Sequence, residues 1–425
     1  MTTRNWAGNV EFGPAPIRAP ETLGELRELV RSSRKLRVLG SRHSFNDIAA
    51  SPDLHLSLER LSRPPTFDRE RQTVTCSPGV TYGELCPLLN AKGVALRNLA
   101  SLPHISVMGA CSTATHGSGD GNQNLATAVV ELELVDAHGE VRRLSRDAEG
   151  DAFSGQVVSL GGLGVVTEVT LATVPAFSMQ QEVFEDLPVA GVYESFDEIT
   201  SCAYSVSLFT DWRDGLVNQV WIKHRLDGSE GRPPATGFLG ARPAPTHRHP
   251  MTELSPDPCT TQMGQPGPWH ERLPHFRVDH TPASGDELQT EYFVPRAHAV
   301  QALQALEGLA DEMAELLWLS EVRTIAADEL WLSPSYRTPT IGIHFSWHND
   351  WEGLQGLLPV VEEALAPLQV RPHWGKVFTL KQEQVASQYP RLDEFKGLLR
   401  DFDPDGKFRN PYLERYLYCG CDGRE

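Results

Sequence analysis

A single histidine, His43, stands in the segment 38–46, where a short apolar stretch runs into a loop that begins with Gly40 and Ser41. Loops of this composition offer backbone N–H groups that can bind a phosphate anion. No second histidine or cysteine stands close to His43 in the sequence, so a shared metal ion is not indicated. A lone nucleophilic imidazole beside such a loop suggests covalent attachment of a cofactor. The alternative is a loop histidine that is hydrogen-bonded to the backbone.

A second run of small residues, 100–119, is crowded with Ser, Thr, Gly and Ala and contains neither Lys nor Arg. Small residues let a backbone approach a ligand closely, and hydroxyl and N–H groups bind phosphate without a full charge. Such a run alone is also typical of a turn-rich connection in a sheet. Both runs contain a histidine, however, and together they favour a ligand site. Neither has the GxGxxG pattern between strand and helix that a Rossmann dinucleotide site requires.

Polar residues alternate along three predicted strands in the second half of the chain. Successive side chains of a strand point to opposite faces, so residues two apart share a face. The pairs formed in this way are Gln289 with Glu291, Glu321 with Arg323, and His344 with Ser346. Three strands with such pairs would line a pocket suited to a polyhydroxylated ligand. The alternative for each strand is a solvated face, on which a Glu–Arg pair contributes at most about 1 kcal/mol.

Other titratable residues carry weaker signals. Lys376 stands among aromatic residues, where it either lies in a site that lowers its pKa or extends to the surface. A stretch rich in Pro, His and Gly contains scattered histidines, among them His247, His249, His270 and His275. Their spacing matches no metal site, and we interpret them as loop residues. No metal is therefore expected.

The elements that must position these residues begin with alternating short helices and strands. Two capping boxes, Thr22 with Glu25 and Thr81 with Glu84, each predict the start of a helix. The second helix should end at Gly93. Apolar and β-branched residues predict strands at 36–39, 73–76, 130–134, 141–144 and 165–171.

The second half has a different composition, which changes after about residue 176. Residues 226–285 show little periodicity and predict a long loop. One apolar stripe predicts a helix over 297–317, and a strand over 340–347 and a helix over 354–365 follow. There is no internal repeat.

Composition places limits on the class of protein. The chain has 425 residues, is 40% hydrophobic and 22% charged, and carries a formal charge of -18. This length suits two domains or one large divided domain. The negative charge argues against nucleic acid or an anionic membrane as a partner. The N-terminus has no signal-peptide pattern, and the seven scattered cysteines form no disulfide framework, so we expect a cytoplasmic protein.

Taken together, these motifs resemble the vanillyl-alcohol oxidase-type flavoenzymes with a PCMH-type FAD domain, and among them the alditol (xylitol) oxidases, which are related to sugar-1,4-lactone oxidases. The resemblance runs from Asn5 to Asn410. The segments that carry it are 5–9, the His43 loop, 101–106, 204–212, 268–276, 321–324 and 373–376. One departure is Arg42, where relatives often have glycine.

The resemblance implies that His43 is bonded covalently to the 8α-methyl group of FAD. The residues that would hold FAD are Gly40, Ser41, Arg42, His43, Ser44, Phe45, Asn46, Ser101, Ser106, Gly109, Ala110, Cys111, Ser112, Thr113, His116 and Val166. Those that would contact the polyol are Ser101, Gln289, Glu321, Arg323, His344, Ser346 and Lys376.

The implied reaction is oxidation of the terminal hydroxyl of an alditol such as xylitol or sorbitol to the aldose. Hydride passes to flavin N5, and O₂ is then reduced to hydrogen peroxide. We expect His344, poised with Lys376, to accept the hydroxyl proton, since a neutral imidazole beside a cation can do so near neutral pH. Arg323 and Lys376 would stabilise the developing alkoxide.

The expected fold is α+β, with a PCMH-type FAD-binding domain (1–176), a substrate domain with an antiparallel sheet flanked by helices (177–370), and a C-terminal segment (371–425) that returns to the FAD domain. We expect a monomer whose partners are a small polyol and O₂. One alternative is a sugar-1,4-lactone oxidase or dehydrogenase of the same fold. Another is a non-catalytic carbohydrate-binding protein.

Overall fold

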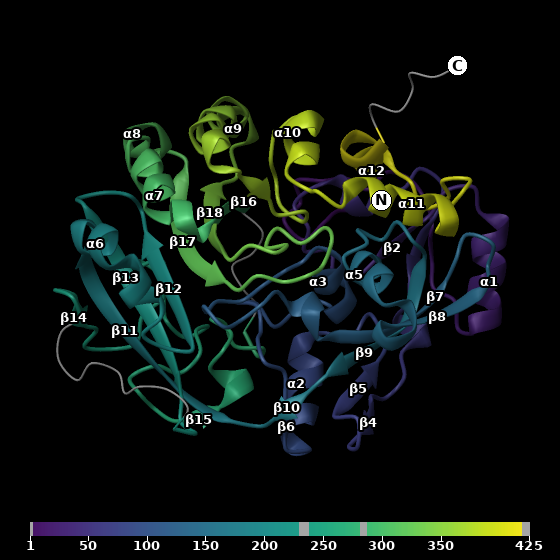
Figure 1. The fold of residues 1–425 in the computed structure, drawn as a ribbon, viewed down its shortest axis with the longest axis horizontal. Helices are drawn as coiled ribbons and strands as arrows, with labels where there is room; N and C mark the ends of the chain where they lie inside the picture. Colours follow the sequence, from purple (N-terminus) through teal and green to yellow (C-terminus); the bar gives the residue numbers. More distant parts are fainter. Residues whose placement is uncertain (1–2, 229–237, 281–286, 419–425) are drawn as a thin grey trace.

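Two large antiparallel sheets form the two halves of the protein (Figure 1). The computed structural model describes residues 3–228, 238–280 and 287–418. Cys419 and Cys421, two of the seven cysteines, lie outside the described residues. The mixed helix and sheet content agrees with the predicted α+β class.

The first half is built on a five-stranded sheet of order β4-β5-β9-β7-β8. Its strands are β4 (Thr66–Asp68), β5 (Thr73–Cys76), β9 (Val165–Ala172), β7 (Val129–Val135) and β8 (Val141–Ser145). A three-stranded parallel sheet of β1 (Ile17–Arg18), β3 (His55–Ser57) and β2 (Arg37–Leu39) lies beside it, and β6 (Val94–Ala95) pairs with β10 (Val174–Pro175). All five strands predicted in this half are present.

Helices of this half begin where the capping residues predict. α1 (Leu23–Ser32) follows Thr22, and α2 (Tyr82–Ala91) follows Thr81, whose capping box with Glu84 is complete. Gly93 adopts φ +75° just after α2 and so allows the chain to leave the helix. Three shorter helices complete this half: α3 (Val107–Ser112), α4 (Arg146–Glu149) and α5 (Asp151–Val157).

The second half is built on a nine-stranded sheet of order β14-β11-β13-β12-β17-β18-β16-β19, with β15 paired to β11. Its strands are β11 (Ser178–Pro188), β12 (Ser205–Thr210), β13 (Leu216–Arg225), β14 (Arg242–Pro243), β15 (Gly267–Pro268), β16 (Glu287–Pro295), β17 (Leu317–Ile325), β18 (Thr340–His348) and β19 (Arg371–Pro372). Helices α6 (Val189–Thr200), α7 (Ala299–Glu307) and α9 (Trp351–Leu365) pack together beside this sheet. The opposite sheet face is left for the polar residues.

The helix predicted over 297–317 is wrong in its extent. α7 ends at Glu307, a short α8 (Ala310–Met313) follows, and Leu317 already begins β17. Gly308 lies at the break, and glycine in a helix interior costs about 1 kcal/mol relative to alanine. The apolar residues near 316 fit a strand as well as a helix, so periodicity alone extended the helix too far.

The segment 226–285 contains few regular elements, as predicted, and some of its described residues pack into the core. Gln262 and Trp269 are fully buried, and His275 is nearly so. Residues 229–237 and 281–285 of the segment lie outside the described residues. This part of the chain therefore contributes to the core of the second half.

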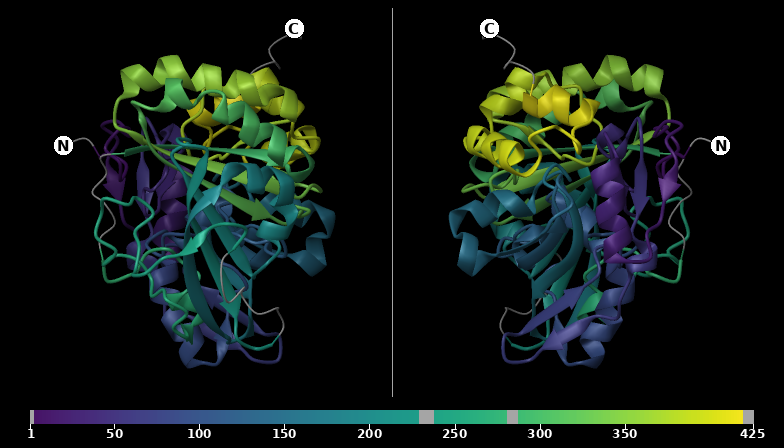
Figure 2. Two further views of the ribbon diagram at one scale, coloured as in Figure 1. Left: turned by 90° about the vertical axis from the view of Figure 1, so that its left-hand side faces the viewer. Right: turned by 90° about the vertical axis from the view of Figure 1, so that its right-hand side faces the viewer.

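The C-terminal helices return to the first half of the chain. In Figures 1 and 2, α9, α10 (Gln382–Ser387), α11 (Leu392–Phe402) and α12 (Pro411–Leu413) lie along one side of the molecule. Asn410 donates from its side-chain nitrogen to the carbonyls of Asp47, Ile48 and Ala50. These bonds fix the chain end against the turn that follows the His43 loop.

Candidate active site

A single cavity of about 1210 Å³ contains most of the predicted site residues. One part of its wall comes from segments 37–45, 77–88, 100–116 and 159–166 of the first half. The other part comes from β16, β17 and β18 and from the turn at 373–376. The cavity is larger than the roughly 300–1,000 Å³ of a common small-molecule pocket. It therefore offers room for a large ligand and a second, smaller one.

The His43 loop is held by backbone bonds on both sides. Phe45 donates its N–H to the carbonyl of Gly375 (2.8 Å), and Trp6 donates to that of Arg42 (2.9 Å). The Trp6 ring lies 5.1 Å from the His43 imidazole. Burial, and then the nearby charge of Lys376, lower the pKa of His43 to about 4. The imidazole is therefore neutral at physiological pH, which is the form that can act as a nucleophile.

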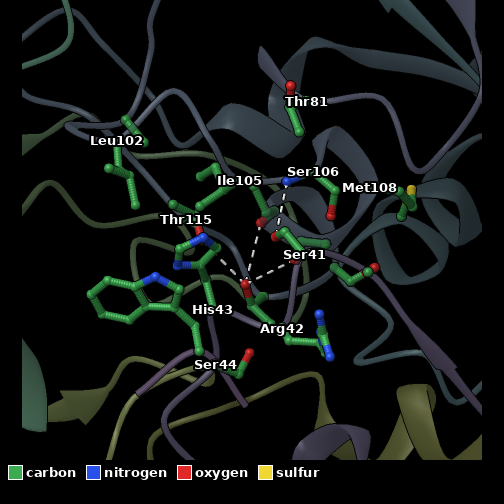
Figure 3. Close-up of a pocket in the computed structure, with 18 of the residues that line it drawn as sticks. Ser41, Arg42, His43, Ser44, Thr81, Leu102, Ile105, Ser106, Met108 and Thr115 are labelled. Carbon is green, nitrogen blue, oxygen red and sulfur yellow. Dashed lines mark hydrogen bonds between the residues drawn. The ribbon is translucent and has the colours of Figure 1, made fainter. Parts of the chain in front are cut away.

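Arg42 stands where relatives often have glycine, and its backbone conformation is that of a glycine position. Its backbone has φ +61°, in the left-handed region where glycine is most at ease. The arginine thus keeps the conformation that a glycine would give, at a cost of roughly 1–2 kcal/mol. Its side chain is exposed and diverges from that of His43 (Figure 3).

Small residues make a tight cradle beside this loop. The N–H of Ser106 donates to Ser41 Oγ over 3.1 Å (Figure 3). A Cβ atom at Gly40 or at Gly109 would come within 2.7 Å or 2.6 Å of Ser106 Oγ. Side chains are thus excluded at both glycines, and backbone faces the cavity there. This arrangement fits the phosphate and ring portions of a dinucleotide.

The predicted cofactor-binding residues do not all reach the cavity. Asn46 instead donates to the carbonyls of Trp374 (2.8 Å) and Lys376 (2.7 Å), and so joins the His43 loop to the 373–376 turn. Cys111 is fully buried in the core against Tyr82. The cavity is lined by the others: Gly40, Ser41, Arg42, His43, Ser44, Phe45, Ser101, Ser106, Gly109, Ala110, Ser112, Thr113, His116 and Val166.

Strand register brings the predicted substrate residues together. Glu291 of β16 pairs with His344 of β18, which pairs with Glu321 of β17. These residues form one row across three neighbouring strands. On one side of this row, Gln289 pairs with Ser346, and on the other side Arg323 lies opposite Gly342. All seven predicted polyol contacts, Ser101 and Lys376 included, line the cavity.

Glu291 is the centre of a buried charge network. Its Oε1 accepts from Arg323 Nη2 (2.6 Å) and lies 2.9 Å from His116 Nε2, while its Oε2 lies 3.8 Å from His344 Nδ1. Burial alone would raise the pKa of Glu291, but His116 and Arg323 outweigh it and hold the pKa well below its usual value. A Cβ atom at Gly342 would lie only 3.2 Å from His116. The glycine thus gives the imidazole room to reach Glu291.

His344 has the geometry of a proton acceptor. Its Nε2 lies 3.3 Å from Ser346 Oγ. Burial first, and Lys376 second, lower its pKa below the ordinary 6.5, so the ring is neutral near pH 7. Lys376 donates to Gln289 Oε1, and burial lowers its own pKa to about 8. A neutral base and a cation therefore face the same space.

Arg323 connects the network to the first half of the chain. Its Nη1 donates to Ser101 Oγ over 3.2 Å, and its Nε lies 3.5 Å from Glu321. Since Arg323 is buried between Glu291 and Glu321, their charges keep its pKa raised despite desolvation. A permanent cation is thus fixed at the substrate end of the cavity.

Sequence reasoning missed two residues of this end. Strand alternation predicts that Glu291 shares the pocket face with Gln289, but Glu291 is not among the predicted polyol contacts, and His275 was interpreted as a loop residue. His275 lies 2.7 Å from Glu321 through Nε2 and lines the cavity. The alternation of β16 indicated the position of Glu291 but not its central role. No local signal indicated His275, because its partners come from distant strands.

Metal-ligand clusters and membrane-spanning helices are both absent from the described residues. No group of three or more His, Cys, Asp or Glu residues there could hold a metal ion. Among the helices of the same residues, none combines the length and the apolar character that crossing a membrane requires.

Comparison with known proteins defines the class first. A family model described as "FAD binding domain" matches residues 14–145, and one described as "D-arabinono-1,4-lactone oxidase" matches residues 285–416. The structure of cholesterol oxidase from B. sterolicum superposes with a TM-score of 0.77 over 98% of this chain and 96% of that one, at 14% identity. The fold is thus that of FAD-dependent oxidoreductases with a PCMH-type FAD domain.

Sequence similarity then defines the family. An alditol oxidase from Streptomyces sp. (strain IKD472 / FERM P-14339) is 46% identical over 417 residues, which cover 97% of this chain and 98% of that protein. An L-gulono-1,4-lactone dehydrogenase from Mycobacterium tuberculosis (strain CDC 1551 / Oshkosh) is 30% identical over 97% of this chain and 98% of its own length. The chain belongs to the same family of FAD-dependent oxidoreductases as this alditol oxidase.

Proposed function

We propose that this chain is an alditol oxidase, which oxidises the terminal hydroxyl of a polyol such as xylitol or sorbitol to the aldose and forms hydrogen peroxide from O₂. One observation carries the proposal. A single cavity joins the small-residue cradle around His43 to a row of charged and hydroxyl groups on β16, β17 and β18. Polar groups of both signs at close range suit a ligand with a hydroxyl on every carbon.

His43 is proposed to hold FAD covalently through the 8α-methyl group of the flavin. Its neutral imidazole lines the cavity beside the cradle of Ser41, Ser106 and Gly109, which supports this assignment. The chemistry that FAD supplies when bound is acceptance of a hydride from the carbinol carbon and delivery of the electrons to O₂. The remaining tasks, binding, orientation and proton removal, belong to the protein.

The polyol is proposed to lie against β17 and β18. His344 accepts the proton of the terminal hydroxyl at Nε2, since its lowered pKa keeps the ring neutral and the Glu291 carboxylate, 3.8 Å from Nδ1, favours the ring proton on Nδ1. Lys376 and Arg323 stabilise the negative charge that develops on that oxygen. Glu321, Gln289, Ser101 and Ser346 bind the hydroxyls farther along the substrate.

A sugar-1,4-lactone oxidase or dehydrogenase is the second candidate. The match of residues 285–416 to the D-arabinono-1,4-lactone oxidase model, which includes β16, β17 and β18, favours it. A lactone presents fewer hydroxyls and a ring to the same wall. The two candidates therefore differ in substrate shape and share the cofactor site.

The predicted division into 1–176, 177–370 and 371–425 is proposed as an FAD-binding part, a substrate-binding part and a returning segment. The two large sheets and the bonds of Asn410 support this division. We further propose that the protein is a monomer and that it acts in the cytoplasm. The cavity is lined by residues from both halves of one chain, which supports the monomer. Size-exclusion chromatography with light scattering tests the oligomeric state.

The proposed function is tested with purified protein in two steps. A visible spectrum is recorded before and after acid precipitation, and peroxide is then measured in air with xylitol, sorbitol and L-gulono-1,4-lactone. Yellow precipitate and peroxide from the alditols are expected. Peroxide or dye reduction with the lactone alone would establish the second candidate. Protein that binds no flavin would contradict both and favour a non-catalytic carbohydrate-binding role.

A further inference from the structure

A lysine lies fully buried behind the wall of the cavity. Lys223 of β13 is 0% exposed and does not line the cavity. Its Nζ donates to the carbonyls of Leu273 (2.5 Å) and Pro274 (3.2 Å) and lies 3.0 Å from His275 Nδ1. A lysine ammonium has three N–H donors, and these three partners use all of them. No carboxylate contacts Nζ directly, so the charged form of this lysine depends on a countercharge that lies beyond its direct neighbours.

His275 makes the connection to that countercharge. Glu321 is ionised, because Arg323 and His275 hold its pKa below the usual value despite burial, so its carboxylate can only accept a hydrogen bond. The single proton of the neutral His275 ring lies on Nε2, and Nδ1 holds a lone pair that can accept from Lys223. Nε2 therefore donates to Glu321 Oε1 over 2.7 Å. The partners fix the tautomer, and edge contacts to Phe209 and Trp221 fix the plane of the ring. Lys223, His275 and Glu321 thus form a continuous chain that ends at the cavity.

The same segment also positions a second predicted polyol contact. The N–H groups of His275 and Phe276 both donate to the carbonyl of Ser101, over 3.0 Å and 3.2 Å. Thr260 in turn donates to the carbonyls of Pro274 and His275. A shift of residues 273–276 would therefore move Ser101 and Glu321 together.

We propose that Lys223 and His275 are positioning residues, a buried relay that holds Glu321 in one ionised, oriented state for the recognition of substrate hydroxyls. This inference rests on the proposed function, since it assigns the relay to the substrate end of that site. Neither residue belongs to the reacting groups: the nitrogens of His275 are both occupied, and Lys223 is outside the cavity. The relay should act on substrate binding and leave the chemical step nearly unchanged.

The charges around the relay agree with this role. The groups that face Lys223 are His275, Cys259, and Glu321 and Arg323 of β17. Burial lowers the pKa of Lys223 to about 7, and Glu321 opposes that shift. Burial lowers the pKa of His275 to about 4, so the ring stays neutral and carries a proton on one nitrogen alone.

Steady-state kinetics with xylitol test the relay. Lys223→Met keeps an unbranched side chain of similar volume, one atom shorter, and removes its donors. His275→Leu removes both nitrogens, whereas His275→Gln retains one acceptor and one donor. We expect KM to rise about tenfold in Lys223→Met and His275→Leu, with kcat within twofold, and to stay within about threefold in His275→Gln. Unchanged KM in the first two variants would overturn the proposal.

His224→Leu is the matched control. His224 is the next residue of β13, is buried, and by strand alternation points to the opposite sheet face. It should change thermal stability without changing KM. A KM rise as large as that of Lys223→Met would assign the effect to general loosening of β13 and overturn the relay.

A double-mutant cycle shows whether Lys223 acts through Glu321. Glu321→Gln removes the carboxylate on which the relay acts. In that background, Lys223→Met should therefore raise KM less than twofold above the value of Glu321→Gln alone. A further tenfold rise in that background would overturn the proposal.

A spectroscopic test is independent of turnover. In NMR spectra of protein labelled with ¹⁵N-histidine, His275 should be the Nε2–H tautomer, with its signals assigned from His275→Gln. An Nδ1–H tautomer would overturn the relay whatever the substrate. Wild-type protein that oxidises no alditol but shows the expected tautomer would contradict the proposed function and leave the relay supported.

Discussion

His344 and Lys376 are the two residues on which the proposed chemistry depends most directly. His344→Gln removes the proton acceptor but keeps a polar side chain beside Ser346. We expect kcat with xylitol to fall about 10²–10⁴-fold, the usual contribution of a general base. Stopped-flow flavin reduction under anaerobic conditions measures this step alone. A rate within fivefold of wild type would remove His344 from the role of base.

The pH dependence follows from the two pKa shifts. His344 must be neutral, and burial lowers its pKa below the ordinary 6.5, so kcat/KM should rise with pH with a midpoint below 6.5. Lys376 must be charged, and its pKa is lowered to about 8, so kcat/KM should fall as pH rises through about 8. The expected profile is a bell between these limits.

Lys376→Met separates the two limbs of that bell. Loss of the cation should reduce kcat/KM by about 10²–10³-fold and abolish the alkaline fall while the acid rise remains. The measurement is a pH series of initial rates for wild type and variant. An alkaline limb that persists in Lys376→Met would have to come from another group.

His43→Ala tests the covalent attachment. The variant should still fold, because the loop is held by backbone bonds of Arg42 and Phe45 and not by the imidazole. We expect it to lose all flavin on acid precipitation, while wild type keeps its flavin. Mass spectrometry of the intact chain should show an added FAD mass in wild type alone. Flavin that remains covalently bound in the variant would place the attachment elsewhere.

At the scale of elements, the turn that carries His116 depends on one glycine. His116 Nδ1 lies 2.8 Å from the carbonyl of Gly117. A Cβ atom at Gly117 would overlap the carbonyl oxygen of Leu99 and the side-chain oxygen of Asn98. Gly117→Ala should therefore lower the free energy of unfolding by about 1–3 kcal/mol and displace His116 from Glu291.

Gly121→Ala is the control for this prediction. Gly121 is exposed, and a Cβ atom there would meet nothing within 4 Å. Denaturant unfolding of the two variants should therefore differ clearly, with Gly121→Ala close to wild type. Equal midpoints would mean that the turn yields more easily than the structure indicates.

The elements themselves were predictable wherever the signal is local. The capping box of Thr81 and Glu84 satisfies the first backbone groups of α2, so that helix began where predicted. The alternation of β18 likewise placed His344 and Ser346 on one face. Gly308 shows the limit of such reasoning, because apolar spacing continued across a residue that ends α7.

The site was less predictable because its geometry comes from register between strands. The row of Glu291, His344 and Glu321 exists only because β16, β18 and β17 are neighbours with one particular alignment. A shift of one residue would turn each side chain to the other face. The role of His275 could not be predicted for the same reason, since its partners Lys223 and Glu321 stand 52 and 46 positions away in the sequence. The resemblance to a family supplied what local patterns could not.

At the scale of the whole molecule, one buried arginine joins segments from three distant parts of the chain. Arg37 of β2 donates to the carbonyls of Ile48 (2.7 Å), Leu160 (2.6 Å), Gly161 (2.9 Å) and Phe408 (2.9 Å). Burial lowers its pKa to about 10, so it remains a cation at neutral pH. It thereby fixes the start of the His43 loop to the C-terminal segment.

Arg37→Met tests whether this junction also holds the cofactor site together. Methionine fills the space but leaves four carbonyls without a donor, so we expect the free energy of unfolding to fall by about 3 kcal/mol or more. Because Leu160, Gly161 and Arg37 itself line the cavity, flavin content should fall as well.

Arg34→Ala is the control, since Arg34 is 84% exposed and pairs with Asp53 at the surface. Its removal should change neither the free energy of unfolding nor the flavin content. Denaturant unfolding and the absorbance ratio of flavin to protein give both readouts. Arg37→Met protein that is less stable but binds flavin fully would show that the contact between residues 371–425 and the FAD-binding part stabilises the fold only. It would contradict a role of this contact in cofactor binding.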